Sequence, residues 1–153
     1  MNIRQSYREA AVQGASPVEL AIRLYEQMIE DLRQVSNAIE KGDIRLRTNR
    51  IRHALLVLGY LQSALDFERG GKVAKDLDHF YDVLRGNLVQ LQFHPSRRGA
   101  AQLITDLVLI REAWIEVDVT QKSAEKAAAG AKPSAVRPYS GDDSDHVPMN
   151  WQG

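Results

Sequence analysis

The sequence predicts an all-helical protein: an antiparallel, up-down four-helix bundle of residues 16–119, with a short N-terminal helical segment (1–15) and a disordered C-terminal tail (120–153). Three observations predict this fold. Apolar residues recur at spacings of three and four along four stretches, cap and stop signals separate these stretches by a few residues, and no stretch alternates like a β-strand. A chain of 153 residues suits one domain with a substantial hydrophobic core.

The first helix is expected to begin at Ser16, with Pro17 in its first turn. Ser16 and Glu19 have the spacing of a capping box, in which each side chain bonds to the other residue's backbone N–H. Lys41 and Gly42 give a typical C-terminus. The apolar stripe of this helix consists of Ala21, Leu24, Tyr25, Met28, Leu32, Val35 and Ile39.

Three further helices follow with short connections. The second is predicted from the cap Asp43 to Arg69, where two glycines stop it, and the third from about 72 to 93. The segment 94–96 ends the third helix, and the fourth begins near Ser96 and continues through Val117. Because short connections force neighbouring helices to run in opposite directions, an up-down topology is expected.

The two ends of the chain differ from the bundle. Residues 1–15 carry only the scattered apolar residues Ile3, Tyr7, Ala11 and Val12. A helix this short is barely stable alone, so we expect the segment to be ordered by docking on the bundle and easily displaced. From residue 120 the chain is rich in Ala, Gly, Ser, Pro and Asp without an apolar face, which predicts disorder.

Composition limits the function. The 20 basic residues equal the 20 acidic ones, so no charge excess indicates nucleic acid or an anionic membrane as the partner. The absence of Cys fits a reducing compartment, and no apolar run has the length of a signal sequence or membrane span. We therefore expect a cytoplasmic protein that does not insert into membranes.

Two histidines are candidate centres of chemistry. A metal site in a bundle needs Glu-x-x-His pairs on several helices. The nearest match is Asp76-x-x-His79, without a second such pair on another of the predicted helices, and His53 stands alone. A phosphotransfer domain centred on either His is the alternative function. No nucleophile motif or phosphate loop is present, so the prediction is a non-enzyme with no catalytic residues, no metal and no cofactor.

Two other features leave alternatives open. Arg45, Arg47, Arg50 and Arg52, and the pair Arg97–Arg98, fit a solvated helix face better than a nucleic-acid surface. The second and fourth helices carry more apolar residues than one core stripe uses. This surplus is compatible with a partner groove, a wide core or a homodimer seam.

Short blocks along the chain, in order, resemble the flagellar secretion chaperone family FliS. The blocks are Tyr7, Ala15–Leu20, Leu24–Glu26, Ala38–Asp43, Ser63–Tyr81 and Leu109–Trp114. They span about residues 3–119. Two departures are Gln27–Met28, where small residues are expected, and a tail that extends past the usual end of the family.

The resemblance implies a cytoplasmic chaperone that binds the C-terminal segment of flagellin, prevents its premature polymerisation and delivers it to the flagellar export apparatus. It implies that the client wraps around hydrophobic grooves of the bundle. The N-terminal segment, with Ile3 and Tyr7, would cover part of this surface when the client is absent. Leu24, Tyr25 and Met28 are the groove candidates on the first helix, although each could equally belong to the core.

Overall fold

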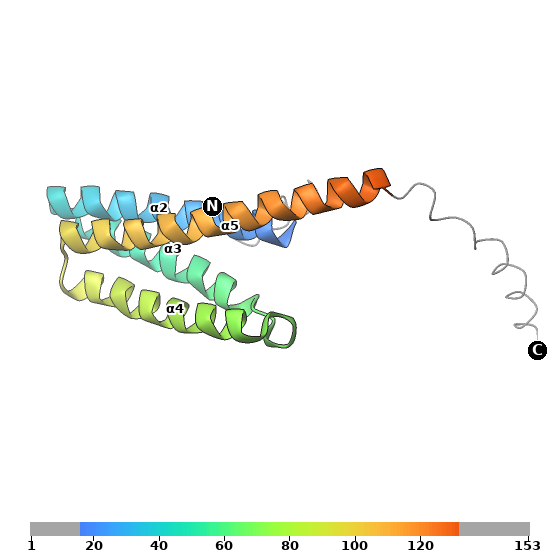
Figure 1. The fold of residues 1–153 in the computed structure, drawn as a ribbon. Helices are drawn as coiled ribbons and strands as arrows, with labels where there is room; N and C mark the ends of the chain where they lie inside the picture. Colours follow the sequence, from blue (N-terminus) through green and yellow to red (C-terminus); the bar gives the residue numbers. More distant parts are fainter. Residues whose placement is uncertain (1–15, 132–153) are drawn as a thin grey trace, which may run out of the picture. The chain divides into compact units, whose positions relative to one another are not determined.

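The computed structural model describes residues 16–131 and contains four helices in this range (Figure 1). They are α2 (Pro17–Lys41), α3 (Ile44–Ser63), α4 (Phe67–Phe93) and α5 (Arg97–Ala131). The chain divides into two compact units, Met1–Glu116 and Val117–Gly153, so the last turns of α5 fall in the second unit. The predicted all-helical class is confirmed. Within the described range, no helix has the length and apolar character needed to cross a bilayer.

Helix α2 begins and ends where the sequence predicts. The Glu19 N–H donates to Ser16 Oγ over 3.1 Å, and the Ser16 N–H donates to Glu19 Oε1 over 3.3 Å. At the other end Gly42 adopts a left-handed conformation with φ of 71°, and the next N–H, that of Asp43, bonds to the Ala38 carbonyl. Both ends of α2 are therefore set by local residues.

Helix α3 ends earlier than the predicted Arg69. It stops at Ser63, and a new helix begins at Phe67 because the Asp66 carboxylate accepts the N–H groups of Glu68 and Arg69, each over 3.0 Å. The predicted stop at the two glycines appears instead as a kink inside α4, where Gly71 has a φ of 50°. The local signal for this boundary is the capping carboxylate of Asp66, four residues before Gly70.

Helix α5 continues to Ala131, beyond the predicted end of the bundle at 119. Residues 120–131 are therefore helical and do not belong to a disordered tail. This stretch contains several alanines, which have the highest helix propensity, and Lys122 Nζ pairs with Oδ2 of Asp118, one turn earlier, over 3.2 Å. The rest of the predicted tail, 132–153, lies outside the described residues.

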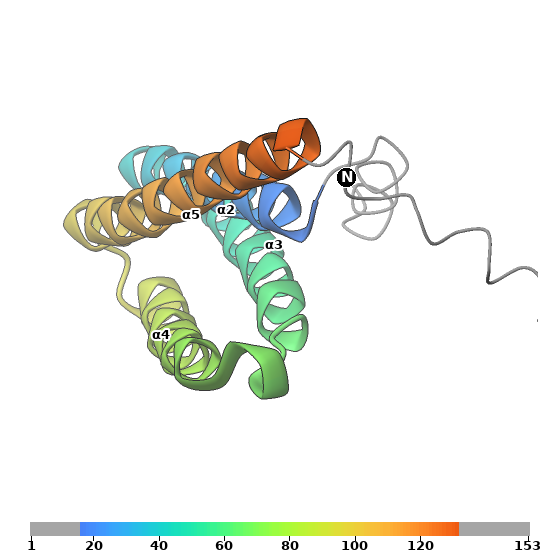
Figure 2. The same cartoon turned by 45° about the vertical axis from the view of Figure 1, so that its right-hand side comes forward.

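Contacts within the first unit show the antiparallel order. Arg97 at the start of α5 pairs with Glu40 near the end of α2 over 3.4 Å. Further along α5, Arg111 pairs with Glu26, which lies nearer the start of α2, over 3.8 Å. Between α3 and α4, Gln92 Nε2 donates to Thr48 Oγ1 over 2.8 Å. Both views show α2 and α5 side by side (Figures 1 and 2). The predicted up-down arrangement is consistent with these contacts.

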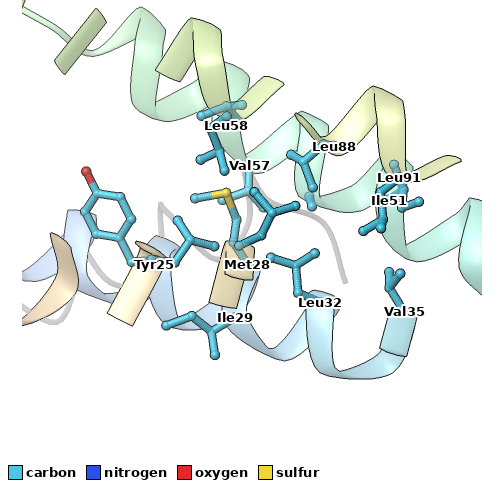
Figure 3. Packing of buried hydrophobic residues seen from close by; sticks show 14 of the residues in the cluster. Tyr25, Met28, Ile29, Leu32, Val35, Ile51, Val57, Leu58, Leu88 and Leu91 are labelled. Carbon is cyan, nitrogen blue, oxygen red and sulfur yellow. The ribbon is translucent and has the colours of Figure 1, made fainter. Parts of the chain in front are cut away.

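All four helices contribute to one core (Figure 3). Its members are Tyr25, Met28, Ile29, Leu32, Val35, Ile51, Ala54, Val57, Leu58, Leu61, Tyr81, Leu84, Leu88, Leu91, Ala100, Leu103 and Leu107. Each large aliphatic side chain buried in this way contributes about 1.5–3 kcal/mol to folding. The core therefore supplies the rigid support on which any binding surface must be built.

Candidate partner-binding surface

A small open pocket lies where α2 begins and α3 ends. Its volume is about 230 Å³, and its walls are mainly apolar. The lining residues are Pro17, Leu20, Ala21, Leu24, Tyr60, Leu61, Ser63 and Ala64. The capping box at Ser16 positions the wall formed by the start of α2. The opposite wall is formed by the end of α3, which stops at Ser63. A concave, apolar and accessible site of this kind accepts apolar side chains of a partner.

Only one of the candidate groove residues on α2 lies at this pocket. Leu24 lines it and is half-buried, so its side chain is available for contact. Tyr25 and Met28 are both 0% exposed and belong to the core (Figure 3). A side chain without exposed surface supports a binding surface from beneath and does not form it. Ile3 and Tyr7 lie outside the described residues.

Three aromatic side chains in and against the core join three helices through their polar atoms. The hydroxyl groups of Tyr25 on α2 and Tyr81 on α4 are hydrogen-bonded, and the Trp114 indole N–H on α5 donates to the Tyr25 hydroxyl over 3.1 Å. The rings of Tyr25 and Trp114 pack with centroids 6.4 Å apart. Buried Tyr and Trp need partners for their polar atoms, and here they satisfy one another. The sequence pattern placed these residues on apolar stripes but did not reveal the hydrogen bonds.

Burial also changes the acidity of these hydroxyls. Loss of hydration on burial, reinforced by the neighbouring Tyr81, raises the pKa of the Tyr25 hydroxyl far above its usual value of about 10. Burial likewise raises the pKa of Tyr81, and the hydrogen bond with Tyr25 partly opposes this rise. Both hydroxyls therefore remain neutral in the folded protein at pH values where they ionise in the unfolded chain.

We predict that the protein loses stability in alkali. Below about pH 10 both tyrosines are neutral in the folded and unfolded chain, and their contribution to stability is complete. Above that pH the unfolded state alone releases their protons, so the free energy of unfolding should fall by up to about 1.4 kcal/mol per pH unit for each group. Urea titrations between pH 8 and pH 11 would measure this fall. An equally steep fall in the double variant Tyr25→Phe/Tyr81→Phe would contradict the assignment.

His53, one of the two histidines considered for chemistry, has a structural partner. Its Nδ1 lies 2.6 Å from Oδ2 of Asp31, a carboxylate with no exposed surface. Arg50 Nη1 and Gln27 Nε2 each lie 3.4 Å from the other oxygen of Asp31. The carboxylate is thus paired on both oxygens, as a buried charge requires. These contacts of the Asp31 carboxylate join α2 to α3, and they explain why His53 occurs among aliphatic residues.

His79 occupies a different environment. It is exposed on α4, and the part of the chain that the structure describes contains no group of three His, Cys, Asp or Glu side chains placed to hold a metal. The polar side chains near the α3–α4 contact bond to one another instead: Gln62 donates to Asp78 over 2.7 Å and accepts from Arg85 over 2.6 Å. These bonds fasten α4 to α3 and offer no reactive group.

The sequence matches the family described as flagellar protein FliS over residues 1–121. The chain belongs to the FliS family. This confirms the resemblance inferred from the blocks of residues, and the matched range includes both the segment with Ile3 and Tyr7 and the pocket at Leu24.

Three curated relatives of the FliS family are similar along most of their length. Flagellar secretion chaperone FliSB of Pseudomonas aeruginosa is 37% identical over 106 residues, which cover 69% of this chain and 84% of that protein. Flagellar secretion chaperone FliS of Vibrio cholerae is 29% identical over 134 residues, covering 82% and 96%. The Salmonella typhimurium protein of the same name is 27% identical over 110 residues, covering 71% and 82%. All three are named as chaperones and none of them as an enzyme, which supports the expectation of a non-enzyme.

Proposed function

We propose that the protein is a cytoplasmic flagellar export chaperone that binds the C-terminal segment of flagellin. It would keep this segment from polymerising and deliver it to the flagellar export apparatus. The observation that carries the proposal is the open apolar pocket at the start of α2, in a chain of the FliS family. The names of the three relatives support the export role.

The physical basis is folding of the client on binding. A disordered client segment loses chain entropy when it becomes ordered, and burial of its apolar side chains at about 25 cal/mol per Å² offsets that cost. The pocket beside Leu24 would accept one such side chain. Because affinity depends on the surplus after the ordering cost, a large contact area can still allow release.

The N-terminal segment is proposed as a competitor for this pocket. The segment ends at the cap Ser16, and the pocket wall begins at the next residue, Pro17. Ile3 and Tyr7 lie within reach of the pocket along fewer than fifteen residues of chain, and their spacing of four places them on one face of a helix. Tyr7 would fill the pocket when the client is absent and leave it when the client binds.

We predict that Leu24→Asp weakens binding of a flagellin C-terminal peptide by about tenfold or more, because a carboxylate in an apolar pocket must lose its hydration. Isothermal titration calorimetry would measure the dissociation constant. Leu109→Asp is the matched control, since Leu109 is 62% exposed on α5 and does not line the pocket. Absence of binding by the unmodified protein at tens of micromolar peptide would refute the proposed function.

Deleting residues 1–12 tests the competitor separately. We expect the bundle to stay folded, with a midpoint of thermal unfolding close to that of the full chain, and the peptide to bind about two- to tenfold more tightly because no competitor must leave. Circular dichroism and calorimetry on the same samples would give both results. Unfolding of the shortened chain would show that the segment is part of the fold.

A further inference from the structure

The two turns of the bundle, between α2 and α3 and between α4 and α5, lie at one end of the first unit (Figures 1 and 2). The pair between Glu40 and Arg97 joins the end of α2 to the start of α5. The Arg47 guanidinium, on α3, donates to the Gln92 carbonyl of α4 over 3.4 Å. We call this part of the bundle the turn end; it comprises residues 40–47 and 91–99. Segments some fifty residues apart in sequence therefore form one surface.

The turn end is basic although the chain as a whole is neutral. No Asp or Glu occurs in residues 44–65 or in residues 83–105. Both carboxylates of the turn end are already occupied: Glu40 pairs with Arg97, and the Asp43 side chain accepts the Leu46 N–H over 3.0 Å. The cations of the turn end are Lys41, Arg45, Arg47, Arg97 and Arg98.

Three of these cations are available to a partner. Lys41, Arg45 and Arg98 are exposed, and none of them forms an ion pair with any residue in the range 16–131. The net charge of zero therefore hides an uneven distribution, with a cationic turn end and most carboxylates elsewhere. A surface of this kind attracts anionic groups and speeds their association.

The turn end also exposes large apolar side chains. Ile44 is 63% exposed and Phe93 is 72% exposed, so both present most of their surface to solvent. A pocket of about 290 Å³ also opens between α4 and α5, and residues of the turn end form part of its lining. Its lining consists of Asn87, Gln90, Leu91, His94, Ser96, Gly99, Gln102 and Leu103. Exposed apolar residues next to a concave site commonly mark a protein interaction surface.

We propose that the turn end is a second docking surface, which binds an acidic segment of another protein that also carries large apolar side chains. Carboxylates of the segment would pair with Arg45 and Arg98, and an apolar side chain would enter the pocket beside Leu91 and Leu103. Ile44 and Phe93 would cover the remaining apolar face of the segment.

The charge and shape of the turn end favour an acidic protein segment over nucleic acid or an anionic membrane as the partner. A protein that makes about six to ten phosphate contacts uses more cations than the three unpaired ones of the turn end. A phosphate backbone also offers no apolar side chain for the pocket. Attachment to an anionic membrane uses a long amphipathic helix face, whereas the turn end exposes Ile44 and Phe93 on separate helices. An acidic amphipathic segment satisfies both the cations and the pocket.

The proposal does not depend on the flagellin hypothesis. The pocket beside Leu24 lies at the start of α2, and the turn end lies at its other end, roughly 36 Å away for a helix of this length. One protein can therefore occupy the turn end while another occupies the pocket at the start of α2. A carrier with two separate docking surfaces can be recruited by one partner without releasing the other.

The test uses the full chain, labelled with ¹⁵N, and a synthetic peptide of about 15 residues made of Glu, Asp, Leu and Phe, a length that can form a helix. We expect amide shifts to concentrate in residues 41–47 and 91–99. Binding should weaken about tenfold or more in Arg45→Glu/Arg98→Glu, and also when NaCl is raised from about 50 mM to about 500 mM. The matched control is Lys75→Glu/Lys126→Glu, which changes net charge equally at exposed sites outside the turn end.

Further probes separate the partner classes. A peptide with Gln and Asn in place of its acids, and one with Ser in place of Leu and Phe, should each bind more weakly if charge and apolar contact both contribute. The proposal is overturned if the acidic peptide does not bind, if the control variant weakens it as much, or if a DNA duplex or phosphatidylserine vesicles bind the same residues more tightly.

Discussion

Replacing Tyr25 with Ala is expected to lower the free energy of unfolding by about 4 kcal/mol, the largest effect of any single change considered for this protein. Tyr25 is 0% exposed and packs in the core against residues of the other helices (Figure 3). The change leaves a large cavity and also removes the hydrogen-bond partner of Tyr81 and Trp114. Chemical denaturation followed by circular dichroism would measure the loss.

The variant Tyr25→Phe separates the ring from the hydroxyl. It keeps the packing and should cost only about 1–2 kcal/mol, because only the hydroxyl's bonds are lost. Client affinity, measured where the variants are folded, should change little in either one. If Tyr25→Ala instead abolished peptide binding and left stability unchanged, Tyr25 would be a contact residue of an open groove and not a member of the core.

His53→Ala is expected to cost about 2–3 kcal/mol of stability, because it leaves one oxygen of the buried Asp31 without its partner at 2.6 Å. Arg50 still lies 3.4 Å from the other oxygen, which keeps the loss below that of a fully isolated buried charge. The same denaturation measurement applies. His79→Ala is the matched control: His79 is exposed on α4, so its removal should change stability by less than about 0.5 kcal/mol.

A double variant tests the cause of that loss. Asp31→Leu/His53→Leu removes the buried charge together with its partner, so stability should return to near that of the unmodified protein. Arg50 is 40% exposed and can turn to water when Asp31 is absent. If the double variant were as unstable as His53→Ala, packing of the imidazole and not compensation of the carboxylate would be the dominant contribution of His53.

These results also bear on the alternative of a phosphotransfer or metal-binding domain. In that hypothesis His53 or His79 would carry the chemistry, and replacing it would remove an activity or a bound metal. In the structure the Nδ1 atom of His53 is hydrogen-bonded to the buried carboxylate of Asp31. Metal analysis of protein purified without chelator, together with His79→Ala, would complete the comparison.

The helix boundaries are determined largely by capping residues close to each helix end. The capping box at Ser16 and the left-handed Gly42 determine the ends of α2 through bonds to residues within four or five positions, and both ends were predicted. Helix α3 ends before the predicted Arg69 because Asp66 caps a new helix, and this cap too is a local signal. The end of α5 was misplaced because an Ala-rich helix needs no apolar face.

The division between core and surface was decided only by the tertiary structure. Leu24, Tyr25 and Met28 share one apolar stripe, and a helical period of 3.6 residues cannot show which part of that stripe the neighbouring helices cover. The structure leaves Leu24 at a pocket and buries the other two. In the same way, the arginines near positions 45 and 98 are separate clusters in the sequence, and only the antiparallel order of the helices brings them to one end. The sequence alone determined the helices, their order and the family; contact between distant segments decided which residues face a partner.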